Sequence, residues 1–524
     1  MMDNNDRQPE INALSPNAEK AVGLKSKILP TLRDRLFFLV TLASCFTLFD
    51  FALGRSGIGV SVYFIGLYLL TALYLWPWKV TDRYAIACGA LGIIVSVSFS
   101  FSVQLTVTFF SIIAAEYLYM VFACGVSDNC VFGNGTVSFI KDASRAFFSD
   151  SIEEIGAVFR TGKEIKDGGQ LLKNIFKCAL GIVIAVPLLC IVLPLLSAAD
   201  GAFESFLDKL FEFELGFDFS HLIFAMMLCP LTCGMLFSLK HKKAEIKYKT
   251  EEFSKPRGID PMVTAGFLGV LSLCYLLYVY SQLGYFFSAF GGSIPDTVKT
   301  AASYARRGFF ELCIISLINF AAIAVALFKT RAEGAYRVCK WFSLFISLFS
   351  IMLIGTALSK MLLYIKLYGL TVRRMLPSVF MLLLILAFVL LIRRIFKGSF
   401  NYMRIFATAC AVTLAVMNFV DISALSADYN AEMYLNTDAA WHIDSPGIDY
   451  LRSLGDAGVP ALVRIASEAE DESVRRAAAS SVERIYNDLV LFDESEGEKA
   501  VRNWRDVNIT TYRADKAFKE YFSN

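Results

Sequence analysis

The stretch LPSVFMLLLILAFVLLI, residues 376–392, contains no charged residue and lies between Arg373–Arg374 and Arg393–Arg394. A helix rises about 1.5 Å per residue, so an apolar run of about 20 residues crosses the roughly 30 Å hydrocarbon core of a bilayer. Backbone N–H and C=O groups inside lipid must be satisfied within the segment, and a helix does this. The stretch therefore predicts a transmembrane helix.

Similar apolar runs recur along the 524-residue chain, which is 56% hydrophobic and only 19% charged. We predict an all-α fold, a polytopic helical membrane bundle with about eleven spans. The predicted spans are residues 36–53, 58–76, 84–102, 105–125, 175–197, 219–239, 261–287, 309–328, 340–359, 376–392 and 404–421.

Lysine and arginine in the short loops predict the orientation, because basic residues favour the cytoplasmic side. Loop 240–258 has seven of them, and 329–340 and 393–404 have four each. The last span runs from a basic into an acidic flank. The N-terminus is therefore predicted to be cytoplasmic and the C-terminus extracytoplasmic, which an odd number of spans satisfies. One predicted outer loop, 360–374, opposes the pattern with Lys360, Lys366, Arg373 and Arg374.

The predicted domains follow from these spans. Residues 1–35 form a polar cytoplasmic segment, 36–125 four spans, and 126–174 a cytoplasmic amphipathic segment that lies on the membrane surface or packs under the bundle. Residues 175–421 hold seven spans with an acidic outer loop at 200–218. Residues 422–524 form a small acidic helical domain: from 421 onward there are 20 acidic and 11 basic residues, a net charge of −9, against +11 for residues 1–420. This charge argues against nucleic-acid binding by the tail.

The C-terminal domain carries the pattern of a HEAT-type helical hairpin. Pro460 is expected at a helix start and Asp471 at the N-cap of a second helix. That second helix has one apolar stripe, formed by Val474, Ala478, Val482, Ile485 and Leu489. A solenoid needs about three repeats and only one is clear, so the hairpin is expected to pack on neighbouring helices or on the membrane helices.

Four motifs carry a family resemblance: YARRGFFEL at 304–312, LYGLTVRRM at 367–375, YLRSLGDAGVPALV at 450–463 and NWRDVNITTYRA at 503–514. Over roughly residues 170–520 the chain resembles an uncharacterised bacterial family of polytopic membrane proteins, defined as a domain of unknown function. The resemblance implies a bacterial cytoplasmic-membrane protein with this topology. It transfers no catalytic residue.

Polar groups at membrane depth are the default functional candidates. Glu116 lies near the middle of the fourth predicted span, where it is either a proton or cation relay or a neutral carboxylic acid hydrogen-bonded within the bundle. Asn319 is the second candidate, and interhelical hydrogen bonding is the expected role. Asn418 and Asp421 are expected to cap the last span.

A basic, aromatic-rimmed patch is predicted at the outer mouth of the bundle, formed by Tyr304, Arg306, Arg307, Tyr368, Arg373 and Arg374. Guanidinium groups suit phosphate, so one interpretation is recognition of an anionic group such as a lipid phosphate or a lipid-linked precursor. The alternative is docking of the acidic tail.

The chain has no P-loop, GxSxG or HExxH motif, and its having only three histidines argues against histidine-based catalysis or metal chemistry. No catalytic residue, metal or cofactor is predicted, and a carboxylate-only enzyme, such as an intramembrane transferase, is the least favoured class. The leading hypothesis is a protein that binds or transports a lipid-like or small solute. The alternative is a membrane scaffold or sensory partner whose outer domain contacts another envelope protein. Membrane lipid and an envelope protein are thus the expected partners.

Overall fold

The computed structural model describes residues 30–51, 57–80, 82–130, 139–154, 219–241, 258–290, 309–331, 334–397, 401–436, 442–494 and 504–523. These residues form helices and connecting turns, and none of them lies in a β-strand. The chain divides into two compact units. Unit 1 comprises Met1–Cys45 and Phe147–Lys242, and unit 2 comprises Phe46–Ala146 and Lys243–Asn524.

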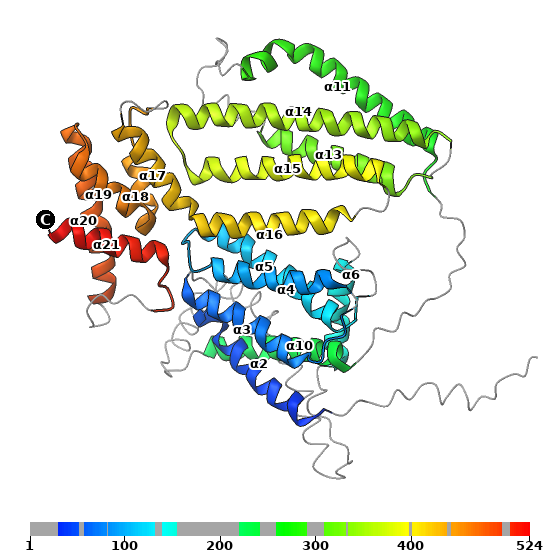
Figure 1. The fold of residues 1–524 in the computed structure, drawn as a ribbon, viewed down its shortest axis with the longest axis horizontal. Helices are drawn as coiled ribbons and strands as arrows, with labels where there is room; N and C mark the ends of the chain where they lie inside the picture. The colour runs from blue at the N-terminus through cyan, green and yellow to red at the C-terminus, as the bar shows by residue number, and fades with distance from the viewer. Residues whose placement is uncertain are drawn as a thin grey trace, which may run out of the picture. The chain divides into compact units, whose positions relative to one another are not determined.

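Each predicted span within the described residues coincides with a helix (Figure 1). These helices are α2 (Leu32–Phe51), α3 (Ile58–Tyr74), α4 (Arg83–Ser98), α5 (Leu105–Val126), α10 (Phe219–His241), α11 (Pro261–Phe290), α13 (Phe309–Phe328), α14 (Tyr336–Tyr368), α15 (Val372–Phe396) and α16 (Tyr402–Val420). In the part of the chain that the structure describes, five helices, α5, α11, α14, α15 and α16, are long and apolar enough to cross a membrane, whereas α3, α4 and part of α13 form shorter apolar helices. The predicted span 175–197 and the acidic loop 200–218 lie outside the described residues, so the count of eleven stays a prediction.

Helix α14 is longer than its predicted span. Its 33 residues correspond to about 50 Å, well beyond the hydrocarbon thickness. The sequence interpretation placed Lys360 and Lys366 in a loop, but the structure places both on the last turns of α14. Their long side chains allow a helix to continue while the ammonium groups reach polar surroundings. The connection to α15 is therefore only Gly369–Thr371.

In unit 2, α14 packs against α11, α13 and α15. The shared core is apolar and is built around Leu268, Ile323, Ile346, Phe388 and Leu391, all buried. A second group joins α3, α4, α5 and α16. There the hydroxyl of the buried Tyr68 donates a hydrogen bond to the Ala115 carbonyl oxygen at 2.6 Å, and the Tyr68 ring fills the space above Gly92.

The C-terminal helices follow α16 in unit 2. They are α17 (Ile422–Leu435), α18 (Ile448–Ser453), α19 (Val459–Glu468), α20 (Glu472–Glu494) and α21 (Ile509–Ser523). Pro460 lies in the first turn of α19, as predicted. Asp471 caps α20: its carboxylate accepts hydrogen bonds from the Ser473 hydroxyl and the Ser473 N–H, each at 2.7 Å, and these bonds lower the pKa of the carboxyl. The assignment to a HEAT-type hairpin stays a prediction.

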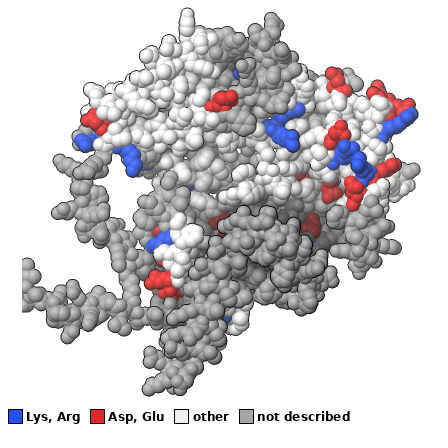
Figure 2. All heavy atoms as spheres, turned by 180° about the vertical axis from the view of Figure 1, so that it is seen from behind, with Lys and Arg blue, Asp and Glu red and all other residues white. Residues whose placement is uncertain are grey.

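The predicted apolar stripe of α20 contributes to the core of these helices. Ala478 and Val482 are buried there, together with Leu451, Leu462 and Ile465 of the preceding helices. Acidic and basic side chains gather over the C-terminal helices, on the right of Figure 2, whereas the described residues in the upper part of this view are mostly white.

We predict that Gly92→Ala lowers the stability of the protein in detergent by about 1–3 kcal/mol. A Cβ at residue 92 would overlap the ring and hydroxyl of Tyr68, whose hydrogen bond to Ala115 keeps the ring in place. Gly266→Ala is the matched control, because nothing lies within 4 Å of a Cβ at that position of α11. Thermal unfolding followed by circular dichroism should show a lower midpoint for Gly92→Ala only. Equal midpoints for both variants would contradict the packing.

Candidate functional site

The short connection between α14 and α15 binds to the C-terminal helices. The Asn430 side chain of α17 pairs with the backbone of Leu370: Oδ1 accepts from the Leu370 N–H at 2.7 Å, and Nδ2 donates to the Leu370 carbonyl oxygen at 2.8 Å. Gly369 has φ 76°, a left-handed conformation, and a Cβ at this residue would run into the Asn430 side chain. Glycine is the residue that allows this approach.

Tyr450 makes the neighbouring contact. Its hydroxyl accepts a hydrogen bond from the Val372 N–H at 2.9 Å and lies 2.8 Å from the Ser426 hydroxyl. Val372 is the first residue of α15, so its N–H has no partner within the helix. A C-terminal side chain thus satisfies a donor at the start of a membrane helix.

Asp421 joins three parts of the chain. It has a left-handed backbone, with φ 47°, and caps α17 through hydrogen bonds from the N–H groups of Ser423 and Ala424. Its carboxylate also accepts hydrogen bonds from two hydroxyl groups. One belongs to Ser102, in the connection between α4 and α5, at 3.3 Å, and the other to Thr510 of α21. Asp421 is only 4% exposed. A buried carboxylate is tolerated because hydrogen bonds compensate its lost hydration.

The segment before α21 contacts the starts and ends of the membrane helices. The N–H groups of Ile58 and Gly59, in the first turn of α3, donate to the carbonyl oxygens of Val507 and Arg505 at 3.0 and 2.9 Å. The Ile509 N–H donates to the Ser100 carbonyl oxygen at 3.1 Å, just after α4. The tail therefore occupies donors and acceptors that helix ends leave without intrahelical partners.

Asn418 continues this polar region into the bundle. Its Nδ2 donates to the hydroxyls of Ser98 and Ser111, at 3.2 and 3.0 Å, on α4 and α5. Asn418 was expected to cap the last span. Instead it links α16 to two other helices. Asp421 is the C-cap of α16, as expected, with its N–H donating to the Asn418 carbonyl oxygen at 3.0 Å, and it also caps the start of α17.

We call the contacts of residues 369–372, 421, 430, 450 and 505–510 the docking junction. Three of the four motifs that carry the family resemblance contribute to it. The junction escaped sequence analysis because its members are up to several hundred residues apart in the chain. The signal that points to it is local: Gly369, Asn430 and Asp421 are polar or flexible residues beside apolar helices.

The two predicted intramembrane residues lie in different settings. Asn319 of α13 is fully buried, donates to the Ser350 hydroxyl of α14 at 2.9 Å and accepts from the Tyr275 hydroxyl of α11 at 2.5 Å. It thus bridges three helices. Glu116 lies on the exposed side of α5, and its carboxylate makes no hydrogen bond or ion pair with the described residues. Its relay role stays a prediction.

The predicted basic patch is only partly described. Tyr304, Arg306 and Arg307 lie outside the described residues. Arg374 donates to the Tyr368 carbonyl oxygen at 2.7 Å and to that of Gly369, and so closes the C-terminal end of α14, with its guanidinium 4.1 Å from the Tyr364 ring centroid.

Arg373 and Tyr368 are exposed near this end of α14. Among the described residues Arg373 and Arg374 form no ion pair with the acidic tail, and the neutral side chains of Asn430 and Tyr450 contact this connection. Docking of the tail on the full set of arginines stays a prediction. Several ion pairs of the tail join its own residues, as Arg464 does with Glu432 at 2.8 Å.

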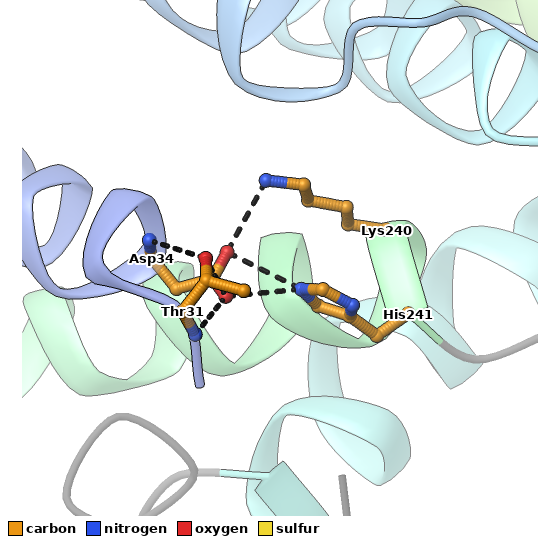
Figure 3. Close-up of polar contacts among 4 residues, drawn as sticks. All are labelled: Thr31, Asp34, Lys240 and His241. Atoms are coloured by element: carbon orange, nitrogen blue, oxygen red, sulfur yellow. Dashed lines mark hydrogen bonds and ion pairs between the residues drawn. The ribbon is translucent and has the colours of Figure 1, made fainter. Parts of the chain in front are cut away.

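Unit 1 contains a charged cluster at the start of α2 and the end of α10 (Figure 3). Asp34 accepts hydrogen bonds from the Thr31 N–H and hydroxyl, at 2.8 and 2.7 Å, which resembles a capping box. Lys240 Nζ and His241 Nε2 each lie 3.2 Å from the buried Asp34 carboxylate. Burial lowers the pKa of Lys240 and Asp34 opposes this effect. Sequence analysis missed the cluster, although Thr31 and Asp34 have capping-box spacing.

Metal ligation finds no support in the described part of the chain, where no group of three or more His, Cys, Asp or Glu side chains is placed to hold an ion. Cys229 and Cys233, which share a face of α10, have their sulfur atoms 3.9 Å apart and are buried.

The family model described as "Domain of unknown function (DUF4153)" matches residues 85–465, from α4 to α19. The chain belongs to the DUF4153 family. The expected resemblance to a domain of unknown function is confirmed, although the match begins earlier than residue 170 and ends before the motif at 503–514. No curated protein and no solved structure matches the chain. The DUF4153 match covers two motifs of the docking junction, including Gly369 and Tyr450.

We predict that Asp421→Asn loosens the docking junction. An amide has one acceptor oxygen in place of two and no negative charge, so the hydrogen bonds from Ser102, Ser423 and Thr510 lose their charge-assisted strength, at a cost of about 1–3 kcal/mol. Hydrogen exchange measured by mass spectrometry should become about tenfold faster in residues 505–523. Asp449→Asn is the control, since that exposed carboxylate pairs only with Arg452. Unchanged exchange in the Asp421 variant would refute the role of this carboxylate.

Proposed function

We propose that this DUF4153 protein is a scaffold of the bacterial cytoplasmic membrane, whose C-terminal helices bind another envelope protein. In this proposal the N-terminus is cytoplasmic and the C-terminal helices are extracytoplasmic. The basic loops 240–258, 329–340 and 393–404 support that orientation. The membrane-helix ends that contact the C-terminal helices all fall on the opposite side from these loops when the predicted spans alternate, although basic residues flank the α14–α15 connection.

A cleft on the C-terminal helices carries the proposal. It has a volume of about 440 Å³ and is lined by Arg452, Ser453, Gly455, Asp456, Arg484, Ile485, Asp488 and Leu489. Ile485 and Leu489 supply apolar surface, and charged residues of both signs surround them. An apolar centre with a polar rim is the usual composition of a protein–protein contact.

The position of the cleft favours a scaffold. Arg452 and Ser453 belong to α18, the helix whose Tyr450 binds Val372 at the start of α15. A partner seated in the cleft is therefore two residues from the docking junction. Its position relative to the membrane helices is set by hydrogen bonds rather than by a flexible linker.

The proposal predicts that a cysteine in the cleft captures a protein from outside the membrane. Ser453→Cys should react in intact spheroplasts with a membrane-impermeant maleimide photocrosslinker and, on illumination, give one adduct of defined mass. Ser480→Cys, on an exposed position of α20 away from the cleft, should be labelled without this adduct. The unsubstituted chain measures the background of its native cysteines. Labelling that requires lysis would invert the orientation, and identical products at both positions would exclude the cleft.

A second candidate function is binding of an anionic lipid-like group at the end of α14. The exposed Arg373 and Tyr368 favour it, because a guanidinium beside an aromatic ring at a helix end suits a phosphate at the membrane surface. The undescribed Arg306, Arg307 and Tyr304 belong to this site by sequence prediction. Binding and transport of a solute through the bundle has no comparable observation in its favour.

For this second function, Arg373→Gln should reduce the anionic lipid that stays bound to the purified protein in native mass spectrometry. Losing one charge–phosphate contact of about 1–2 kcal/mol corresponds to roughly five- to thirtyfold weaker binding. Arg393→Gln, which changes an exposed arginine at the opposite end of α15, is the control. Equal lipid retention by both variants would eliminate the patch.

A further inference from the structure

Three apolar or aromatic residues near the start of α21 are exposed. Trp504 is 56% exposed, Ile509 37% and Tyr512 67%. Farther along α21, Ala514, Ala517 and Phe518 are buried against the other C-terminal helices, and Phe522 in the last turn is 50% exposed with its ring 4.7 Å from that of Tyr486. The first turn of α21 and the segment before it therefore have an apolar surface that these helices do not cover.

The docking junction holds this surface at the ends of membrane helices. Arg505 accepts from the Gly59 N–H of α3, Ile509 donates to the Ser100 carbonyl oxygen after α4, and the Thr510 hydroxyl lies 3.1 Å from the Phe101 carbonyl oxygen. The Trp504 ring also makes an edge contact with Phe51, the last residue of α2, at 5.8 Å between centroids. Trp504, Ile509 and Tyr512 thus lie at the level where the apolar helices end.

The membrane helices expose apolar residues at the same level. Ile58, at the start of α3, is 38% exposed, and Leu105, at the start of α5, is 66% exposed. The exposed apolar residues around Trp504 therefore lie at the same height as the exposed apolar residues at the ends of the membrane helices.

The charge of the tail changes at the same place. Residues 504–523 contain four basic and three acidic residues, a net charge of +1, whereas residues 421–503 contain 7 basic and 17 acidic, a net of −10. Anionic lipid headgroups attract basic segments and repel acidic ones. The part of the tail held against the helix ends is thus the part that a lipid surface tolerates.

We infer that Trp504, Ile509 and Tyr512 insert into the headgroup region of the bilayer and form a lipid-contacting anchor for the C-terminal helices. Tryptophan and tyrosine favour this region because each has an apolar ring and a polar hydrogen-bonding group. The inference holds for either leaflet. It is independent of the cleft, which is lined by residues of α18, α20 and the turn between α18 and α19.

Depth-dependent fluorescence quenching tests the anchor. The other four tryptophans, Trp76, Trp78, Trp341 and Trp441, are replaced by phenylalanine, and the protein is placed in vesicles of phosphatidylglycerol and phosphatidylcholine that contain nitroxide-labelled lipid. Trp504 emission should be quenched several-fold more by a headgroup nitroxide than by one deep in the acyl chain. Ile113→Trp, on an exposed position closer to the middle of α5, and Lys519→Trp, farther along α21, are controls made in a background with Trp504→Phe.

The Ile113→Trp control should be quenched by the deep nitroxide, and Lys519→Trp by neither. Quenching of Trp504 by the headgroup label supports the anchor. The absence of lipid quenching, or stronger quenching by the deep label, would overturn it.

A second measurement keeps the native tryptophans. Tyr512 or Lys519 is replaced by a benzophenone-bearing amino acid in the otherwise unchanged protein, and the illuminated vesicles are analysed by mass spectrometry. A phospholipid adduct at position 512 that is absent at 519 supports the anchor. Equal lipid adduct yields at the two positions, or none at either, would overturn it.

Discussion

The docking junction exists because the ends of helices leave backbone groups without intrahelical partners. Where these ends emerge from lipid next to other protein, water cannot always reach them, and each buried group left unpaired costs free energy. In unit 2 the tail satisfies several of these groups directly: carbonyl oxygens of Arg505 and Val507 accept from the first turn of α3, and Tyr450 accepts from the start of α15. Arg374 satisfies the carbonyl oxygens at the end of α14. The position of the C-terminal helices is thus fixed by hydrogen bonds to backbone groups at the ends of the membrane helices.

Hydropathy predicted where the helices are, because lipid imposes the same requirement on every span: an apolar run that hydrogen-bonds to itself. The match between predicted residues 105–125 and α5 at Leu105–Val126 illustrates this. Residues such as Lys360 and Lys366 misled the placement of a helix end, since charge alone does not stop a helix. The site was far less predictable. Nothing near Asn430 in the sequence indicates Leu370, and Thr510 is 89 residues from Asp421.

The tail's net charge of −9 suggested docking on arginines, but neutral groups make most of the contact. A physical reason is that both partners of a buried ion pair lose the free energy of hydration. Their Coulomb attraction often does no more than offset this loss. Amide, hydroxyl and backbone groups are cheaper to bury when each finds a partner. Asp421 is the exception, and its carboxylate accepts hydrogen bonds from hydroxyl and backbone donors instead of pairing with a cation. The acidic groups of the tail stay available on its surface.

The same contacts bear on what the protein does. A transporter that alternates between two arrangements moves one group of helices against another around a central site. In unit 2, the junction ties α3, the α4–α5 connection, the α14–α15 connection and the end of α16 to one set of C-terminal helices. Rocking these helices apart would break hydrogen bonds to Asn430, Tyr450 and Asp421 together, leaving buried polar groups unpaired at each. Helices tied together in this way are better suited to hold a partner in a fixed position than to open and close around a solute. This constraint favours the proposed scaffold over a transporter.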